Sequence, residues 1–282
     1  FWAVLGTAGS LPFILSSAVE LSITDAVFES LSGLTTTGAT VISGLDELPK
    51  SILFYRQQLQ WLGGMGIIVL AMALLPMLGI GGMQLYRAES PGPVKDNKLV
   101  PRLAETAKAL WYIYLTLTVV CALAYWIVGM DLFDAISHSF TTVAIGGFST
   151  HDASLGYFDN AAVDMVAIIF MFIAGVNFAL HFTAWQRRKI GHYLSDPEFQ
   201  FYAFILALVS VLTVSVLYFS DIYSSLFEAT IKGVFQVVSM ATTTGFATAD
   251  FNSWPLFLPY VLLYAAIIGA CAGSTGGGMK VI

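Results

Sequence analysis

Hydrophobic residues dominate long stretches of this chain, and polar residues gather in the shorter segments between them. The clearest apolar stretches cover residues 67–78 with their flanks, 110–128, 163–182, 201–219 and 256–272. A helix needs about 20 apolar residues to cross a hydrocarbon core of roughly 30 Å. Several of these stretches approach or exceed that length, so the pattern predicts an all-α integral membrane protein.

One unit recurs along the chain: an apolar helix, a short half-polar helix, a loop rich in Thr and Gly, and a second apolar helix. The loops reach corresponding glycines at Gly38, Gly147 and Gly245, which are 109 and 98 residues apart. Thr-Thr-Thr-Gly occurs twice at this place, and Ala-Ile-Gly-Gly stands there in the second loop. These spacings suit two membrane spans with their connections, so we predict three helix–pore loop–helix units.

The repeat divides the chain into units at residues 1–85, 86–192 and 193–282. The first unit has a truncated N-terminal helix, and the last helix of the third unit is broken by glycines. Both ends of the chain lie in apolar sequence, so we expect a piece of a longer protein. The flanking helices are expected at residues 1–15 and 49–78, 103–129 and 158–186, and 198–220 and 255–282.

Charged residues make up only 11% of the chain, against about 25% in soluble domains, and 57% of the residues are apolar. The linkers between units carry nine Lys and Arg, and the loop side carries three, Lys50, Arg56 and Lys232. The positive-inside rule therefore places the linkers in the cytoplasm and the loops facing outside. Thirteen acidic residues lie on the loop side. They form either a vestibule that concentrates cations or an ordinary solvated surface.

Loops at membrane depth are tolerated only where protein buries them or where they line a water-filled path. Glycine reaches backbone angles that turn successive carbonyls toward one axis, and such carbonyls can replace the hydration shell of an alkali ion. Threonine hydroxyls add oxygen atoms, and the short helices point negative dipole ends at the loops. The loops thus predict a cation selectivity filter, with a polar turn between helices as the alternative.

A second glycine-rich segment, residues 269–280, interrupts the helix expected at the end of the third unit. Consecutive glycines disfavour a helix there. A phosphate-binding P-loop does not fit, because Met279 separates Gly278 from Lys280. We expect a flexible constriction, or gate, below the filter, and a packing kink is the alternative. The expected gate residues are Gly273, Ser274, Thr275, Gly276, Gly277, Gly278 and Lys280.

Other polar positions have simpler interpretations. His138 is expected to form local hydrogen bonds, and the glycines at 63, 64 and 66 to permit close helix packing. Asn177 and His181 share a helix face, and we interpret them as interhelical contacts in preference to a site for a coupling ion. Cys121 and Cys271 lie in apolar segments without metal-ligand spacing. No Ser-His-Asp or paired-carboxylate site can be assembled, so we expect no enzyme.

Taken together, Thr-Thr-Thr-Gly-Ala-Thr, Ala-Ile-Gly-Gly-Phe-Ser-Thr, Thr-Thr-Thr-Gly-Phe-Ala-Thr and Ala-Gly-Ser-Thr-Gly-Gly-Gly-Met-Lys resemble the Trk/Ktr/HKT superfamily of potassium transporters. The resemblance covers essentially the whole chain and is closest to bacterial TrkH-type potassium-uptake subunits. It implies a potassium-channel-like pore of four units in one polypeptide, of which three are present here and the fourth is missing. Three loops alone cannot close such a filter.

The resemblance also implies roles for individual residues. Backbone carbonyls just before each filter glycine would coordinate K⁺, the transported ion, and residues 273–278 would match the intramembrane gating loop. In the family, serine in place of the first glycine is associated with sodium permeation. The implied filter residues are Thr36, Thr37, Gly38, Ile145, Gly146, Gly147, Thr243, Thr244 and Gly245.

The family further implies a multi-pass protein of the bacterial plasma (inner) membrane, surrounded by lipid and working as a homodimer. A cytosolic nucleotide-binding regulatory ring of the TrkA type would be its partner, docking on the side of the basic linkers 87–108 and 187–189. No organic cofactor and no nucleic acid are expected.

Two other function classes compete with a gated potassium-uptake pore. One is a membrane enzyme that handles a phosphate or lipid substrate at the glycine-rich loop, which would require substrate binding by this chain. The other is a secondary transporter with ion coupling, by symport, at Asn177 and His181. Flux that depends on a proton or sodium gradient would separate it from a passive pore.

Overall fold

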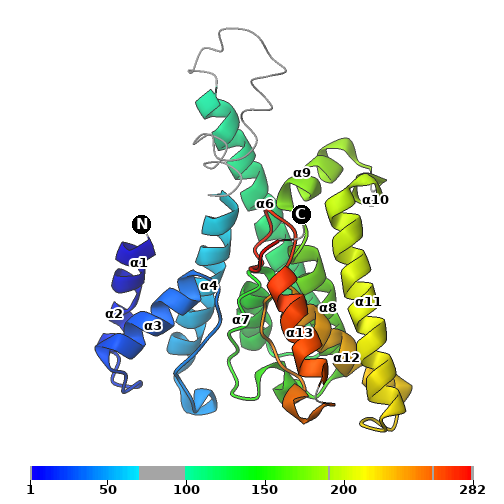
Figure 1. Cartoon of the computed structure of the whole chain (residues 1–282). Coiled ribbons are helices and arrows are strands. Elements are labelled where there is room, and N and C mark those ends of the chain that lie inside the picture. Colours follow the sequence, from blue (N-terminus) through cyan, green and yellow to red (C-terminus); the bar gives the residue numbers. More distant parts are fainter. Residues whose placement is uncertain (1, 70–98, 190, 256, 281–282) are drawn as a thin grey trace.

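The computed structural model describes residues 2–69, 99–189, 191–255 and 257–280, and the regular elements in these ranges are helices (Figure 1). The helical fold expected from the sequence is therefore confirmed. The α-helices are α1 (Trp2–Gly9), α2 (Leu11–Leu15), α3 (Ile23–Leu34), α4 (Lys50–Val69), α6 (Leu99–Ile127), α7 (Leu132–Val143), α8 (Ala161–Ala174), α9 (Phe178–Arg187), α10 (Gly191–Ser195), α11 (Pro197–Phe219), α12 (Leu226–Ala241) and α13 (Phe257–Ile268). Short 3₁₀ helices lie between them at η1 (Leu45–Glu47), η4 (Ser154–Phe158) and η5 (Phe251–Ser253).

Two of the described helices are long and apolar enough to cross a membrane, at Ala107–Ile127 and Pro197–Phe219. The pair α8 and α9 also passes this test together, but the two helices are bent by 89° at their junction. Large apolar side chains such as Val211 and Phe219 on α11 are exposed. Because such surface is costly in water and favourable in lipid, it fits a membrane environment.

The helix expected at 158–186 is wrong as a single element, because α8 ends at Ala174 and α9 begins at Phe178. The Asn177 side chain accepts a hydrogen bond from Ala179 N and so caps a new helix. The break frees backbone groups that the glycine-rich segment satisfies: Cys271 N donates to Gly175 O at 3.0 Å, and Phe178 N donates to Gly273 O at 3.1 Å. The break is therefore built to receive that segment.

Other expected helices also need correction. The helix expected at 1–15 is two helices, because Pro12 stands in the first turn of α2 and lacks the N–H that a continuous helix would need. The helix expected at 255–282 ends at Ile268. Helix α6 begins four residues before its expected start, and α11 lies within one residue of its expected bounds. Helix α4 is described to Val69, and residues 70–78 lie outside the described part.

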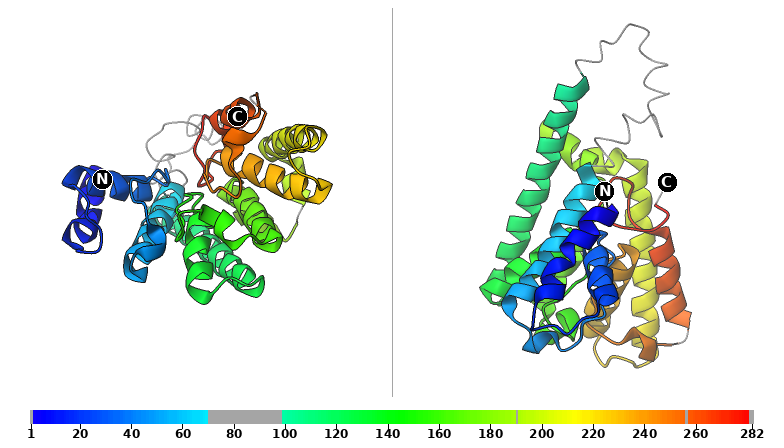
Figure 2. Two further views of the ribbon diagram at one scale, coloured as in Figure 1. Left: turned by 90° about the horizontal axis from the view of Figure 1, so that it is seen from below. Right: turned by 90° about the vertical axis from the view of Figure 1, so that its left-hand side faces the viewer.

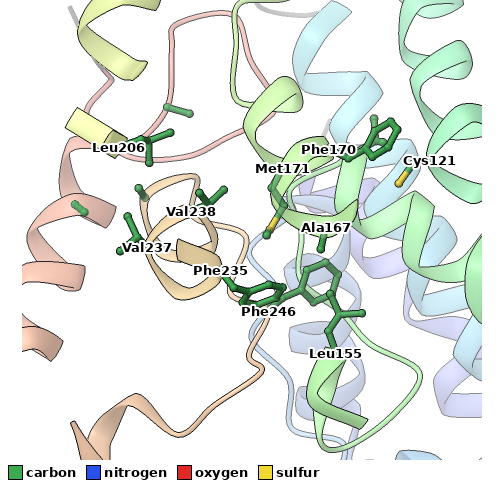
Figure 3. Packing of buried hydrophobic residues seen from close by; sticks show 14 of the residues in the cluster. Cys121, Leu155, Ala167, Phe170, Met171, Leu206, Phe235, Val237, Val238 and Phe246 are labelled. Carbon is green, nitrogen blue, oxygen red and sulfur yellow. The ribbon is translucent and has the colours of Figure 1, made fainter. Parts of the chain in front are cut away.

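The short helices α3, α7 and α12 pack among the longer ones, and successive units follow one another around an arc when seen from below (Figure 2). Phe235 of α12, Phe246 and Ala167 of α8 belong to one cluster of buried apolar side chains (Figure 3). A second cluster holds the N-terminal helices together around Phe13, Leu34 and Leu59. Both clusters surround the loops that follow the short helices, and so they fix where those loops lie.

Glycines let α4 pass very close to two of the short helices. A Cβ on Gly63 would lie 2.0 Å from the carbonyl oxygen of Leu34, at the end of α3. A Cβ on Gly64 would lie 2.7 Å from the Tyr114 hydroxyl and 3.0 Å from the Cβ of Ala144, just after α7. The expected role in close helix packing is confirmed for Gly63 and Gly64 but not for Gly66, whose nearest atom lies at an ordinary contact distance of 3.5 Å. The two close contacts bring α4 directly behind the loops.

Gly63→Ala should destabilise the protein, because its methyl group would collide with backbone that cannot move cheaply; overpacking of this kind typically costs about 1–3 kcal/mol. Gly66→Ala is the matched control on the same helix, where the nearest atom, on Trp2, lies 3.5 Å away. It should be neutral or slightly stabilising. Thermal unfolding in detergent measures both, and equal melting temperatures for the two variants would contradict the packing described here.

Candidate functional site

The three short helices begin in the same way. Each is capped at its N-terminus by a Ser or Asp side chain that accepts a backbone N–H, and each has an acidic residue in its first turn. These features satisfy free donors and complement the positive end of the helix dipole. The opposite, negative ends therefore point toward the loops. The caps are Ser22, Asp131 and Ser225, and the first-turn acids are Asp25, Asp134 and Glu228.

The chain leaves each short helix along one common path. A non-glycine residue in the left-handed region comes two positions before the corresponding glycine, which is also left-handed. The residue between them donates its N–H to the carbonyl five positions earlier, at 2.8–2.9 Å in all three loops. The φ angles are 55° at Thr36, 53° at Ile145, 66° at Thr243, 77° at Gly38, 76° at Gly147 and 85° at Gly245.

The left-handed residues strain the backbone, and they also set the direction of its carbonyl groups. Left-handed Thr36, Ile145 and Thr243 each cost roughly 1–3 kcal/mol, which the surrounding structure must offset. A backbone that alternates between left-handed and ordinary residues turns successive carbonyls toward the same side. Such a row of carbonyls is what cation coordination requires.

The loops approach one another too closely for side chains to fit between them. A Cβ on Gly38 would lie 2.0 Å from the carbonyl oxygen of Gly146, and a Cβ on Gly147 would lie 1.9 Å from that of Thr244. The first loop therefore meets the second, and the second meets the third, in the same way: the glycine of one loop lies against a carbonyl of the next. A Cβ on Gly245 would meet no described atom within 4 Å, and Thr37 and Gly245 are exposed. In the described part, the ring is open between the third and first loops.

Hydroxyl groups hold the first and third loops from behind. Ser32 Oγ donates to Ala39 O at 2.6 Å, and Ser239 Oγ donates to Phe246 O at 2.7 Å. The corresponding residue of the second loop, Thr141, bonds back to its own helix instead. The matching serines mark the two Thr-Thr-Thr-Gly loops as a pair.

Gln60 of α4 takes over this task for the second loop. Its Nε2 donates to Gly146 O at 2.7 Å, and its Oε1 accepts from Phe148 N at 3.1 Å. The side chain is fully buried. Because sequence reasoning considered the loops alone, it missed Gln60; a polar residue one helical turn from Arg56 in a membrane helix was the available signal.

A buried ion pair joins the first and second loops. Arg56 Nε donates to Glu29 Oε1 at 2.8 Å, and both side chains are at most 1% exposed. The guanidinium also donates to Thr40 Oγ1 at 3.0 Å and Ser149 O at 3.2 Å, and it lies over the Phe148 ring. Removing one partner of such a pair leaves an uncompensated buried charge. Arg56 thus has a structural role between the loops and does not belong to the surface on which the sequence analysis counted it.

The surface on the loop side is still predominantly acidic once Arg56 is left out of it. Lys232 does not count toward this surface either, because its Nζ pairs with the buried carboxylate of Asp164 at 2.9 Å. Of the three loop-side cations, all of which lie in the described residues, Lys50 is the one that is exposed. The exposed acids on the same side are Glu20, Asp46, Glu47, Asp131, Asp152, Asp159, Asp221, Glu228 and Asp250.

His151 links two of these acidic segments beside the second loop. Its Nδ1 contacts Asp46 Oδ1, and its Nε2 lies 3.2 Å from Asp134 Oδ2. The ring stacks on Tyr157 with centroids 3.5 Å apart. Burial disfavours the imidazolium, but the hydrogen bonds to Asp134 and Asp46 outweigh it, so the pKa of His151 is raised. The hydrogen bond from His151 lowers the pKa of Asp46.

The glycine-rich segment lies directly against the ends of α7 and α12. Gly277 N donates to Thr243 Oγ1 at 2.7 Å, and Thr275 Oγ1 donates to Val143 O at 3.1 Å. A Cβ on Gly276 would lie 3.0 Å from Thr242 O. The predicted gate residues therefore touch the predicted filter residues of the third loop.

Three anchors hold this segment from its other side. Two are the backbone bonds to the break between α8 and α9. The third is Glu198 in the first turn of α11, whose Oε1 accepts from Ala272 N. Ser274 Oγ donates to Cys271 O at 2.6 Å, and Lys280 Nζ donates to Gly276 O within the segment. Glu198, which the sequence analysis missed, is the side chain that ties the segment to the linker between α9 and α11.

The remaining candidates have structural roles. His138 bonds to Asp134 O and Ser149 Oγ, both at 2.9 Å, as expected of a local contact. His181 bonds to Tyr193 OH and Ile173 O, so it is an interhelical contact, whereas Asn177 is a helix cap. Among the described residues, no cluster of three His, Cys, Asp or Glu could hold a metal ion. The backbone carbonyls and hydroxyls of the three loops are therefore the groups in this arrangement that could bind a cation.

Comparison with known proteins gives consistent matches over the whole chain. The family model described as "TrkH: Cation transport protein" matches residues 1–282. The chain is 61% identical to the Trk system potassium uptake protein TrkH of Vibrio parahaemolyticus and to that of Escherichia coli K12, and 44% identical to the Trk system potassium uptake protein TrkG of Escherichia coli K12. The crystal structure of the potassium transporter TrkH from Vibrio parahaemolyticus matches with a TM-score of 0.90 at 56% identity.

These matches cover 99–100% of this chain but less of the relatives. The chain spans 58–59% of the length of these curated relatives and 57% of the crystallised chain.

His151→Gln should lower stability more at pH 6 than at pH 8.5. A raised pKa means that the charged bridge contributes fully below about pH 6.5, the ordinary pKa of histidine, and is lost as pH rises through the higher folded value. We expect a loss of about 1 kcal/mol at pH 6, because Asp46 is partly exposed. Melting temperatures of both proteins across pH 5.5–9 (about the range in which histidine titrates) measure it. A difference that grows with pH would contradict the bridge.

Proposed function

The chain belongs to the TrkH family of cation transport proteins, and from this premise we propose that it forms three quarters of a pore for potassium uptake across the bacterial inner membrane. The family is one of transport proteins and not of enzymes, so the enzyme hypothesis is dropped. Relatives of this chain carry the name potassium uptake protein, which supports K⁺ as the transported ion.

One observation carries the proposal: three loops with the same left-handed alternation meet glycine to carbonyl, the first against the second and the second against the third. A dehydrated K⁺ needs several oxygen ligands at once, which carbonyls of several converging loops can supply. We assign this role to backbone carbonyls just before each filter glycine. The proposed ligands are those of Thr36, Thr37, Ile145, Gly146, Thr243 and Thr244, with Gly38, Gly147 and Gly245 as filter glycines.

These contacts also support a fourth unit in the working pore. Gly38 lies against Gly146 and Gly147 against Thr244, whereas Gly245 faces open space in the described part. A fourth loop that follows the same pattern would place the carbonyl of the residue before its filter glycine against Gly245. Its filter glycine would then lie against the carbonyl of Thr37. We propose that the units at 1–85, 86–192 and 193–282 act together with such a loop.

Charge supports an outward orientation of the loops. The loop side presents exposed acids with Lys50, whereas Arg187, Arg188 and Lys189 lie at the other end, beside α10 (Figure 1). An acidic mouth would raise the local concentration of cations. The basic linkers would face the cytoplasm, where we propose that a nucleotide-binding regulatory ring docks on a homodimer.

Residues 273–278 are the proposed gate. Their hydrogen bonds to Thr243 Oγ1 and Val143 O hold them beside the ends of α12 and α7. We propose that this is the cytoplasmic end of the filter, in the path of an ion that leaves it. Glycines at Gly273 and Gly278 adopt left-handed angles, which lets the segment fold back without a helix. Glu198 and the α8–α9 break connect the gate to the linker helices, which gives the regulatory ring a mechanical route to it.

Ion coupling at Asn177 and His181 has less support. Asn177 Oδ1 already accepts from Ala179 N, and both ring nitrogens of His181 have partners. Neither side chain offers a free ligand for a coupling ion, which favours a passive pore.

Gly38→Ser and Gly245→Ser in the full-length protein should each weaken selectivity for K⁺ over Na⁺ by about tenfold, which corresponds to ~1.4 kcal/mol of differential binding. A side chain at a left-handed filter position shifts the carbonyls that match the larger ion. Reversal potentials or competitive ⁸⁶Rb⁺ uptake in vesicles measure the change.

Gly44→Ser is the matched control for backbone strain. Gly44 has a similar φ of 72°, a Cβ there would meet no described atom within 4 Å, and it lies outside the filter. Its variant should keep wild-type selectivity. If Gly44→Ser and Gly245→Ser behave alike, the filter assignment is wrong.

Deletion of residues 276–278 should raise K⁺ flux or free it from regulation, because it shortens the segment that blocks the exit. Thr275→Val, which removes the hydrogen bonds of Thr275 Oγ1 to Val143 O and Ala174 O, should have the same effect in weaker form. Selectivity should stay unchanged in both, since the filter residues remain. Flux through the full-length protein in vesicles, with and without its regulatory partner, is the measurement; wild-type flux in both variants would rule out the gate.

A further inference from the structure

A large apolar cavity lies away from the filter, between α6, α8, α9, α10 and α11. Its volume is about 610 Å³, within the roughly 300–1,000 Å³ typical of small-molecule sites. Tyr112 and Thr116 of α6 form one wall, and Phe172 of α8 and Phe199 of α11 form another. Tyr112 and Trp185 on its walls are 57% and 66% exposed, so the cavity opens to the surroundings there.

The few polar groups on the cavity walls are largely occupied. His181 Nδ1 bonds to Tyr193 OH at 2.8 Å, and its Nε2 bonds to Ile173 O at 3.0 Å. Rings of Phe172, Phe199, Tyr193 and His181 pack against one another along the same wall. The surface offered to an occupant is therefore mostly carbon, which suits an alkyl chain and disfavours a nucleotide or a sugar.

The mouth of the cavity combines two features of a membrane interface. Helix α9 leaves α8 at 89°, which turns it away from the direction of the spanning helices. Trp185 near its end is exposed, as tryptophans at the headgroup level usually are. Arg187, Arg188 and Lys189 follow within four residues and are all exposed. Clusters of Lys and Arg at the end of membrane helices attract anionic headgroups.

From this geometry we propose that the cavity binds one acyl chain of an anionic phospholipid whose headgroup contacts Arg187, Arg188 and Lys189. The apolar walls recognise the chain, and the basic run selects the charge. Val176 and Phe199 line the cavity next to Gly175 and Glu198, which anchor the glycine-rich segment. The bound chain therefore packs against the supports of that segment.

Native mass spectrometry of the full-length protein, with phosphatidylglycerol or phosphatidylcholine added, tests the site. Wild type should retain one phosphatidylglycerol at least about fivefold more tightly than phosphatidylcholine, the effect expected of even one cation at the surface. Thr116→Trp fills the cavity and should abolish this binding. Leu123→Trp, at an exposed position of the same helix outside the cavity, is the matched control and should retain it.

A triple variant, Arg187→Gln with Arg188→Gln and Lys189→Gln, should still hold one lipid but lose the preference for phosphatidylglycerol. In vesicles, phosphatidylglycerol with brominated acyl chains should quench Trp185, seen as the difference between wild type and Trp185→Phe. This second readout needs no variant that fills the cavity. Unchanged lipid retention in Thr116→Trp, or no quenching of Trp185, would overturn the proposal. Conversion of a dimer to monomers by Thr116→Trp, without loss of lipid, would overturn it in favour of a second copy of the chain.

Discussion

The structure depends on one kind of close approach: the glycines of the first and second loops, Gly38 and Gly147, each lie against a backbone carbonyl of the next loop. A Cβ at Gly38 or Gly147 would stand only 1.9–2.0 Å from that carbonyl oxygen, so any larger residue there would displace the neighbouring loop. This contact brings backbone oxygens of separate loops together without intervening side chains. Inside a membrane such exposed carbonyls are unfavourable unless they face water or an ion. The same contact therefore sets the packing of the loops, and it is the feature on which the proposed selectivity filter rests.

Side chains and close helix contacts behind the loops stabilise their strained backbone. The small residues Gly63 and Gly64 admit α4 to the rear of the loops, where Gln60 and Arg56 reach their backbone. Glu29 neutralises the arginine, because an unpaired charge in this setting would be very costly. The glycine-rich segment packs against the ends of α7 and α12 and is itself held by hydrogen bonds to the break between α8 and α9. The scaffold thus satisfies buried polar groups of one element with those of another.

The sequence alone predicted the apolar helices, the three corresponding loops and the glycine-rich segment, because these follow from hydrophobic length, repetition and local propensity. It did not predict the α8–α9 break, because Gly175 and Asn177 sit in an apolar stretch that reads as continuous, and the break is stabilised by residues almost a hundred positions later. Gln60, Glu198 and His151 were missed for the same reason: each acts across a large sequence separation. Arg56 was placed on the outer surface, because a count of charges does not reveal which partners are buried.

The central claim is that the converging carbonyls of these loops bind a dehydrated potassium ion. X-ray diffraction from crystals of the full-length protein grown in Rb⁺, at the rubidium absorption edge, tests it most directly. We expect an anomalous peak on the axis between the loops, within ligand distance of carbonyls of Thr36 or Thr37, Ile145 or Gly146, and Thr243 or Thr244. A crystal that is well ordered in the loops but shows no peak there, or shows one only at the acidic outer surface, would contradict the account.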